Sequence, residues 1–189
     1  MLGDTPTGEI EAIVDLTGSV IPPSGFFTIA EGSFTIGPPP DLVAFINFEN
    51  TDTLTHMLVG GLSALVSDNV DLNADGVFDI TPWITVLDTV AMIHPASTEL
   101  PYGPNNPTGG APNCVMGPTC QEVSDGIAVP QQIYRCPDGD GTWQIGNIDP
   151  AAMPLTDTPG GPNACGGPIC GDGMVDMGED CDDGGESAT

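Results

Sequence analysis

The sequence predicts an almost entirely β protein, a sandwich or a barrel, and three observations carry that prediction. Short runs rich in β-branched and aromatic residues fill the first hundred positions, Gly/Pro clusters separate these runs, and no segment combines a long helical period with capping residues. Such spacing is typical of β-sandwiches and barrels. At 189 residues the chain suits one domain with, at most, a small appendage.

The expected strands follow one another in a simple order. Those in the first hundred residues are 9–16, 25–36, 41–50, 55–62 and 82–93. The Gly-, Pro- and Asn-rich stretch 101–130 has little to build strands from, so we expect a long loop that a disulfide clips. A last pair of strands, 131–136 and 142–146, flanks the turn PDGDG.

The charge balance excludes whole classes of partner. Twenty-seven acidic residues face a single base, Arg135, for a formal net charge of −26. Such a chain repels phosphate backbones and anionic membranes, so we expect no nucleic acid partner. Apolar residues make up 39% of the chain, which favours a folded protein over disorder. Divalent cations at carboxylate clusters would relieve the self-repulsion, although adaptation to high salt also favours acidic surfaces.

Six cysteines indicate an oxidising compartment. They all lie in the second half of the chain, at Cys114, Cys120, Cys136, Cys165, Cys170 and Cys181. An even number of cysteines among Gly/Pro-rich loops favours disulfides and an extracellular or cell-surface location. A metal cluster is the rival interpretation, but no pair has the two-residue gap of a zinc knuckle.

Membrane and export signals are not evident in the sequence. No apolar run reaches the roughly 20 residues that a transmembrane helix needs. The opening MLGDTPTGEI lacks a basic n-region and an apolar h-region. Because disulfides imply export, we expect that a signal was removed or lies outside this chain.

One stretch, DLNADGVFDITP at 71–82, has the spacing of a calcium loop. Such a loop has oxygen ligands at positions 1, 3, 5, 7 and 9 and a glycine at position 6. Here the oxygen ligands would be the side chains of Asp71, Asn73, Asp75 and Asp79 and the carbonyl of Val77, and the glycine is Gly76. Position 12 is Pro82 instead of a bidentate glutamate, so Asp68, Asp88 or water would complete the shell. A weak calcium affinity of roughly 10⁻⁴ to 10⁻³ M is therefore expected. The alternative is a solvated acidic turn.

Other candidate residues favour structural roles. Asp138 and Asp140 could hold a second ion, but Asp-Gly pairs are turn formers first. His56 and His94 have no Ser or Cys motif around them, and GxSxG, HExxH and phosphate-loop motifs are absent from the sequence, so we expect no enzyme. Trp83 and Trp143 are expected in the core.

Several segments resemble the secreted bacterial relatives of the lamin tail domain. They are DLTGSVIPPSGFFTIAEGSFTIG, INFENTDTLTHMLV, DLNADGVFDITPWITVLDTVAMI, YRCPDGDGTW and TPGGPN. The resemblance covers roughly residues 9–163, without the family's opening strands, and implies an immunoglobulin-like β-sandwich. On this basis residues 1–164 are expected to form the sandwich, with long Gly/Pro-rich loops.

The tail CGDGMVDMGEDCDDGG resembles the start of a cysteine-rich repeat in surface proteins of myxobacteria and other environmental bacteria. Residues 165–189 would then be a partial, acidic, disulfide-bound repeat. The resemblance implies that Cys170 and Cys181 form one disulfide. The other four cysteines can pair in three ways, of which we expect Cys114 with Cys120 and Cys136 with Cys165. The tail acids could bind calcium loosely or form a solvated charge run: Asp172, Asp176, Glu179, Asp180, Asp182 and Asp183.

Neither resemblance implies catalysis. We expect an extracellular structural protein that calcium and disulfides stabilise and that assembles with copies of itself into a fibre or array. The glycine-rich tail has no core of its own, and the missing opening strands would leave a sheet edge for another chain. The alternative is an accessory or binding domain of a secreted hydrolase or nuclease, which neighbouring catalytic sequence would support.

Overall fold

The computed structural model confirms an all-β protein. It describes residues 2–3, 8–46, 52–94, 96–98, 100–102, 120–123, 132–136, 138, 142–146 and 158–163. Within these ranges there is no helix, so none that could cross a membrane. The strands are β1 (Leu2–Gly3), β2 (Glu9–Ile10), β3 (Ile29–Ala30), β4 (Leu42–Val43), β5 (Leu54–Gly60), β6 (Thr85–Met92), β7 (Cys120–Val123), β8 (Ile133–Cys136) and β9 (Thr142–Ile145).

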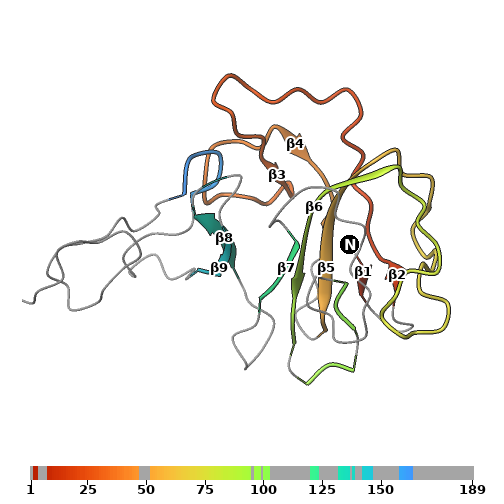
Figure 1. Ribbon diagram of the computed structural model, residues 1–189. Coiled ribbons are helices and arrows are strands. Elements are labelled where there is room, and N and C mark those ends of the chain that lie inside the picture. Colours follow the sequence, from red (N-terminus) through yellow and green to blue (C-terminus); the bar gives the residue numbers. More distant parts are fainter. Residues whose placement is uncertain are drawn as a thin grey trace, which may run out of the picture.

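The antiparallel pair β5–β6 forms the centre of the largest sheet, whose strand order is β2-β1-β5-β6-β7 (Figure 1). Its register runs from Leu54 opposite Met92 to Gly60 opposite Thr85, with an irregularity between Leu58 and Val59. Both strands match segments that the sequence predicts. They are rich in β-branched and large apolar residues, which fit a pleated, half-buried surface.

The prediction of a loop over 101–130 is wrong at residues 120–123, which form strand β7. Residues 120–123 run parallel to β6, with Cys120 opposite Thr89 and Val123 opposite Met92. The sequence CQEV has a single β-branched residue and no alternation that would indicate a strand. Its place on the sheet edge comes from pairing with β6, a contact between distant parts of the chain.

Three expected strands are much shorter than the sequence suggests. Within 9–16, 25–36 and 41–50 the ladders cover only the two-residue strands β2, β3 and β4. β3 and β4 pair in parallel, apart from the main sheet and beyond one of its ends (Figure 1). An apolar run specifies a buried segment, but a ladder also needs a partner strand in register.

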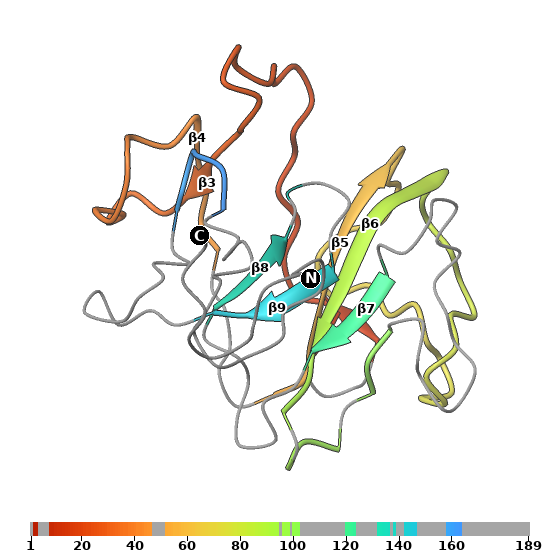
Figure 2. The same ribbon diagram turned by 60° about the vertical axis from the view of Figure 1, so that its left-hand side comes forward.

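The two faces of β5–β6 pack against different parts of the chain, because successive side chains of a strand point to opposite faces. Leu54, Val90 and Met92 contact Ile133 and Trp143 of the β8–β9 hairpin, which lies beside the sheet in Figure 2. Met57 points to the other face and packs against a second apolar cluster, Ile10, Val70 and Tyr102. Trp83 packs against that cluster too, so both tryptophans have the core role expected of them.

Candidate metal site in the acidic loop

The acidic loop that follows Val70 is closed at its base by main-chain hydrogen bonds. The amides of Asp79 and Ile80 both donate to the carbonyl of Val70, at 2.9 and 3.1 Å. The amide of Val70 itself donates to the carbonyl of Gly8 at 3.0 Å. Residues 71–79 therefore form a closed loop attached to the strand β2 region.

The turn within the loop uses left-handed backbone conformations. Gly76 has a φ of 83°, a conformation that costs glycine little and other residues more. Ala74, two residues earlier, has a φ of 55°. The sharp turn predicted at the sixth loop position is therefore where the glycine lies.

Asp71, at the first position of the loop, is the most buried carboxylate of the loop, with 1% of its surface exposed. Its Oδ2 atom accepts hydrogen bonds from the Gly76 amide and from the hydroxyl of Tyr102, both at 2.8 Å. Its Oδ1 atom accepts from the Asp75 amide at 3.2 Å. These three donors satisfy a carboxylate that would be costly to bury without partners.

The remaining oxygen-bearing side chains bond within the loop. Asn73 Oδ1 accepts from the Asp75 amide at 3.2 Å, and Asp75 Oδ1 accepts from the Val77 amide at 2.9 Å. Asp79 Oδ2 accepts from the Leu72 amide at 2.7 Å. The side chains of Asn73 and Asp75 also meet, with Nδ2 donating to Oδ2 at 3.1 Å.

The donor set of the loop fits a hard cation, since carboxylate, amide and carbonyl oxygens are the ligands that calcium takes. The carboxylates are not drawn together around one point, however. Within the described residues no group of three or more His, Cys, Asp or Glu side chains is arranged to hold a metal ion. Asp75 and Asp79 are both exposed, and their side chains would have to turn toward Asp71 for the loop to hold an ion.

Tyr102 ties the loop to the hydrophobic core, and no sequence pattern indicated this role. Its side chain is fully buried, its amide donates to Thr55 Oγ1 at 3.1 Å, and its ring stacks on Phe78 with centroids 4.7 Å apart. Burial raises the pKa of Tyr102 well above its usual value, and the hydrogen bond to Asp71 raises it further. Tyr102 is therefore neutral near pH 7, and its hydroxyl donates a hydrogen bond to Asp71.

Gly8 lets the chain approach this cluster closely. A Cβ atom at Gly8 would lie 2.7 Å from Asp71 Cβ and 2.8 Å from the Tyr102 hydroxyl. Gly8 also has a φ of 88°. Any other residue at this position would push against the hydrogen bond that holds Asp71.

The two extra ligands considered for the loop have other partners. Asp68 Oδ2 accepts from the Leu65 amide at 2.8 Å. Asp88 forms an ion pair with Arg135, with 2.8 Å between Asp88 Oδ1 and Arg135 Nη2. The Arg135 guanidinium lies 4.5 Å from the centre of the Trp143 ring, on the side of the sheet that faces the β8–β9 hairpin. Water, and not Asp88, is the better candidate to complete a shell.

Asp138 has the turn role expected of an Asp-Gly pair. Its Oδ2 atom accepts from the amide of Asn163 at 3.0 Å, while Asn163 Nδ2 donates to the carbonyl of Arg135. Segment 158–163 is thus fastened to the β8–β9 hairpin. Asp140 and the six tail acids lie outside the described residues.

The cysteines are only partly within the described residues. Cys136 is disulfide-bonded. Cys120 lies in β7, where the backbone alone is described, and the other four cysteines lie outside the described residues, as does the segment 165–189. The three pairings therefore remain predictions.

The two histidines are held in the sheet region. Burial lowers the pKa of His56, in β5, to about 4, so its imidazole is neutral near pH 7. His94 Nδ1 accepts from the amide of Ala96, and the His94 amide donates to Thr53 Oγ1, both at 3.2 Å. The burial of His56 and the hydrogen bonds of His94 fit structural roles for both residues.

Comparisons with known proteins add no relative. No family model, no curated protein and no solved structure matches the chain. The resemblance to lamin-tail-like domains and to the cysteine-rich repeat therefore stays a prediction from the motifs.

Proposed function

We propose that this chain is a non-catalytic structural protein of the cell exterior, stabilised by a calcium ion in the loop 71–79 and by disulfides, and that it assembles with copies of itself. The observation that carries the proposal is the placement of Asp71. Its buried carboxylate joins the loop turn, through Gly76, to the core, through Tyr102. A cation bound at such a loop would stabilise the core as well as the loop.

Charge gives the physical reason for a cation. The net charge of −26 makes the compact state repel itself, and one buried arginine cannot offset it. Calcium held by Asp71, Asn73, Asp75, Asp79 and the carbonyl of Val77 would remove part of this repulsion. Disulfides, of which Cys136 takes part in one, would add stability in the Gly/Pro-rich second half.

The finer fold assignment belongs to the same proposal. The β8–β9 hairpin packs its Ile133 and Trp143 on one face of β5–β6, which supports two packed layers of an immunoglobulin-like β-sandwich. The lamin-tail-like resemblance leads to the same fold.

Calcium binding is tested by thermal unfolding in calcium and in chelator. With a dissociation constant of roughly 10⁻⁴ to 10⁻³ M, about 10 mM calcium stabilises the folded state by about 1.4–2.7 kcal/mol. We expect a Tm increase of about 3–10 °C for a chain of this size. The variant Asp75→Ala should lose this increase.

Asp15→Ala is the matched control. Asp15 Oδ1 accepts from the amide two residues on, Thr17, at 2.9 Å, as Asp75 Oδ1 does from Val77 at the same distance. Both substitutions remove one carboxylate and its local hydrogen bonds, but Asp15 is outside the loop. The calcium effect should persist in Asp15→Ala. Equal Tm values of the unaltered chain in calcium and in chelator would refute the metal site.

A further inference from the structure

The loop residues Asp75 and Gly76 form an Asp-Gly pair, a sequence that can rearrange chemically without an enzyme. Six such pairs occur in the chain, and this is the one whose two residues both lie within the described part of the structure. Glycine has no Cβ atom to shield its backbone nitrogen, so that nitrogen can reach the carboxyl carbon of the preceding aspartate. The side chain of Asp75 is exposed to solvent, whereas Gly76 is buried.

The rearrangement needs no other reactant than water. The Gly76 nitrogen bonds to Cγ of Asp75 as its N–H bond breaks, and one oxygen of the carboxyl group leaves as water, which closes a five-membered imide ring. Water then opens the ring at one of its two carbonyl carbons. Opening at the former side-chain carbon restores aspartate. Opening at the former main-chain carbon gives isoaspartate, in which the main chain runs through Cγ and the mass is unchanged.

The Asp71 carboxylate holds the nitrogen that would attack. Its Oδ2 atom accepts a hydrogen bond from the Gly76 amide at 2.8 Å, and Asp71 is buried, so water does not replace this bond. A hydrogen bond to a charged acceptor is among the stronger ones in proteins. It keeps the proton on the Gly76 nitrogen and fixes the amide toward Asp71 instead of toward the carboxyl carbon of Asp75.

The carboxyl group of Asp75 is held as well. Its Oδ1 atom accepts from the Val77 amide at 2.9 Å, and its Oδ2 atom accepts from Asn73 Nδ2 at 3.1 Å. Ring closure requires this group to turn toward the Gly76 nitrogen and to lose one oxygen, so both of these bonds must break. The folded loop therefore opposes the reaction at both reacting atoms.

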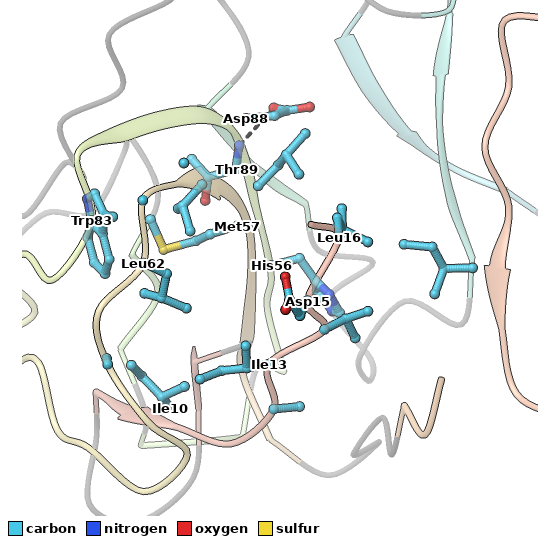
Figure 3. Close-up of a pocket in the computed structure, with 18 of the residues that line it drawn as sticks. Ile10, Ile13, Asp15, Leu16, His56, Met57, Leu62, Trp83, Asp88 and Thr89 are labelled. Atoms are coloured by element: carbon cyan, nitrogen blue, oxygen red, sulfur yellow. Dashed lines mark hydrogen bonds between the residues drawn. The ribbon is translucent and has the colours of Figure 1, made fainter. Parts of the chain in front are cut away.

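The restraint on Gly76 depends on Tyr102, whose hydroxyl donates to the same Asp71 Oδ2 atom at 2.8 Å. The ring of Phe78 stacks on Tyr102, and Trp83 meets Phe78 edge-on with centroids 5.1 Å apart. Trp83 in turn borders a cavity of about 920 Å³ beside β5 (Figure 3). Atoms that face a cavity lack packing partners there, so this aromatic cluster is held less firmly than one packed on all sides. Local openings that release the Gly76 amide are therefore expected.

We propose that Asp75–Gly76 is a modification site, at which spontaneous isomerisation to isoaspartate is held back by the hydrogen bond from the Gly76 amide to Asp71. The rate of the modification follows how often that bond opens. In isoaspartate the free carboxylate is carried on Cα instead of Cβ, so a modified loop presents this group in a different place. One consequence rests on the proposed calcium site: a chain with isoaspartate at position 75 no longer holds the ion.

The test compares the folded chain with a synthetic peptide of residues 69–81, which lacks Tyr102 and the rest of the fold. Both are incubated near neutral pH in chelator, so that calcium plays no part. Asp-N protease cleaves before aspartate but not before isoaspartate, so mass spectrometry of the digest measures the modified fraction at position 75. The folded chain should form isoaspartate there about tenfold or more slowly than the peptide, the factor that one hydrogen bond to a charged group corresponds to.

Two variants release the amide within the full chain. Asp71→Asn removes the charge that holds Gly76 and should raise the rate at position 75 by about tenfold. Tyr102→Phe frees Asp71 from the core and should raise this rate by a smaller factor. Asp41→Asn is the matched control, because Asp41 also accepts a main-chain hydrogen bond, from Thr28 at 2.8 Å, but lies outside the loop. Circular dichroism and Tm identify a variant that fails to fold; if Asp71→Asn does, Tyr102→Phe carries the test.

The outcomes separate this inference from the proposed function. If the folded chain and the peptide isomerise equally fast, or if the folded Asp71→Asn and Tyr102→Phe variants keep the rate of the unaltered chain, the restraint by Asp71 is refuted. A peptide that forms no isoaspartate at position 75 would overturn the modification site itself. If the rates follow the prediction but the modified chain keeps its calcium-dependent increase in Tm, Asp75 is not a calcium ligand, and the proposed metal site fails while the modification site stands.

Discussion

Replacing Tyr102 with phenylalanine isolates one hydrogen bond between the acidic loop and the core. The change removes the hydroxyl that donates to Asp71 Oδ2 at 2.8 Å and leaves the ring, which stacks on Phe78. Asp71 then keeps its main-chain donors from Gly76 and Asp75 but loses a side-chain donor in a site without solvent. We expect a marked loss of stability with no loss of apolar contact.

The magnitude follows from the charge and burial of the acceptor. A hydrogen bond to a charged group contributes about 1.5–3 kcal/mol. Since Asp71 is 1% exposed, water cannot replace the lost donor without opening the cluster, so a value of about 2–3 kcal/mol is expected. For a chain of this size that corresponds to a Tm decrease of roughly 4–12 °C.

Denaturant and thermal unfolding in chelator provide the assay, because calcium would add its own contribution. Tyr134→Phe is the control: it removes a hydroxyl that donates to Gln144 Oε1 at 2.9 Å in an exposed pair. Its cost should stay below about 0.5 kcal/mol. If Tyr102→Phe costs no more than Tyr134→Phe, Asp71 is not held by the core and the link between loop and core is refuted.

Three further predictions concern other parts of the molecule. Because burial lowers the pKa of His56 to about 4, the unfolded state binds a proton more readily than the folded state. The free energy of unfolding should therefore fall by on the order of 3 kcal/mol as the pH drops from about 6.5 to about 4. The variant His56→Gln should flatten this pH dependence, and an unchanged slope in that variant contradicts the assignment. Asp88→Asn removes the charge facing the Arg135 guanidinium, whose side chain is 7% exposed. It should cost about 2–3 kcal/mol in urea unfolding, less than the roughly 3–5 kcal/mol of a fully buried pair because Asp88 is 26% exposed. A cost near zero would make the pair dispensable. Mass spectrometry of the unreduced chain should find all six cysteines oxidised, and any free thiol would refute the disulfide set.

The acidic loop could be predicted from its local sequence pattern, but the hydrogen bond from Tyr102 that supports it could not. The spacing of Asp71, Asn73, Asp75 and Gly76 lies within six residues, and the left-handed φ of Gly76 is where the pattern requires it. Tyr102, by contrast, is 31 residues from Asp71, and a lone tyrosine before a Gly/Pro-rich stretch carries no signal. Only the fold brings them together.

The strands divide in the same way. β5 and β6 are predictable because they are long, apolar and adjacent in space, so local pattern and partner agree. β7 depends wholly on its neighbour β6, and the ladders at β2, β3 and β4 are cut short where no partner is in register. Composition predicts burial at those segments, but it cannot predict pairing.

The position of Arg135 could not be predicted from the charge balance of the sequence. The count of 27 acids against one base indicates an acidic surface in need of cations, yet it says nothing of where the base lies. The fold places it inside, between Asp88 and the Trp143 ring, where it fastens the β8–β9 hairpin to β6. The surface is therefore left without a cation from the described residues. If copies assemble as proposed, the contacts between them would then be apolar or bridged by metal ions.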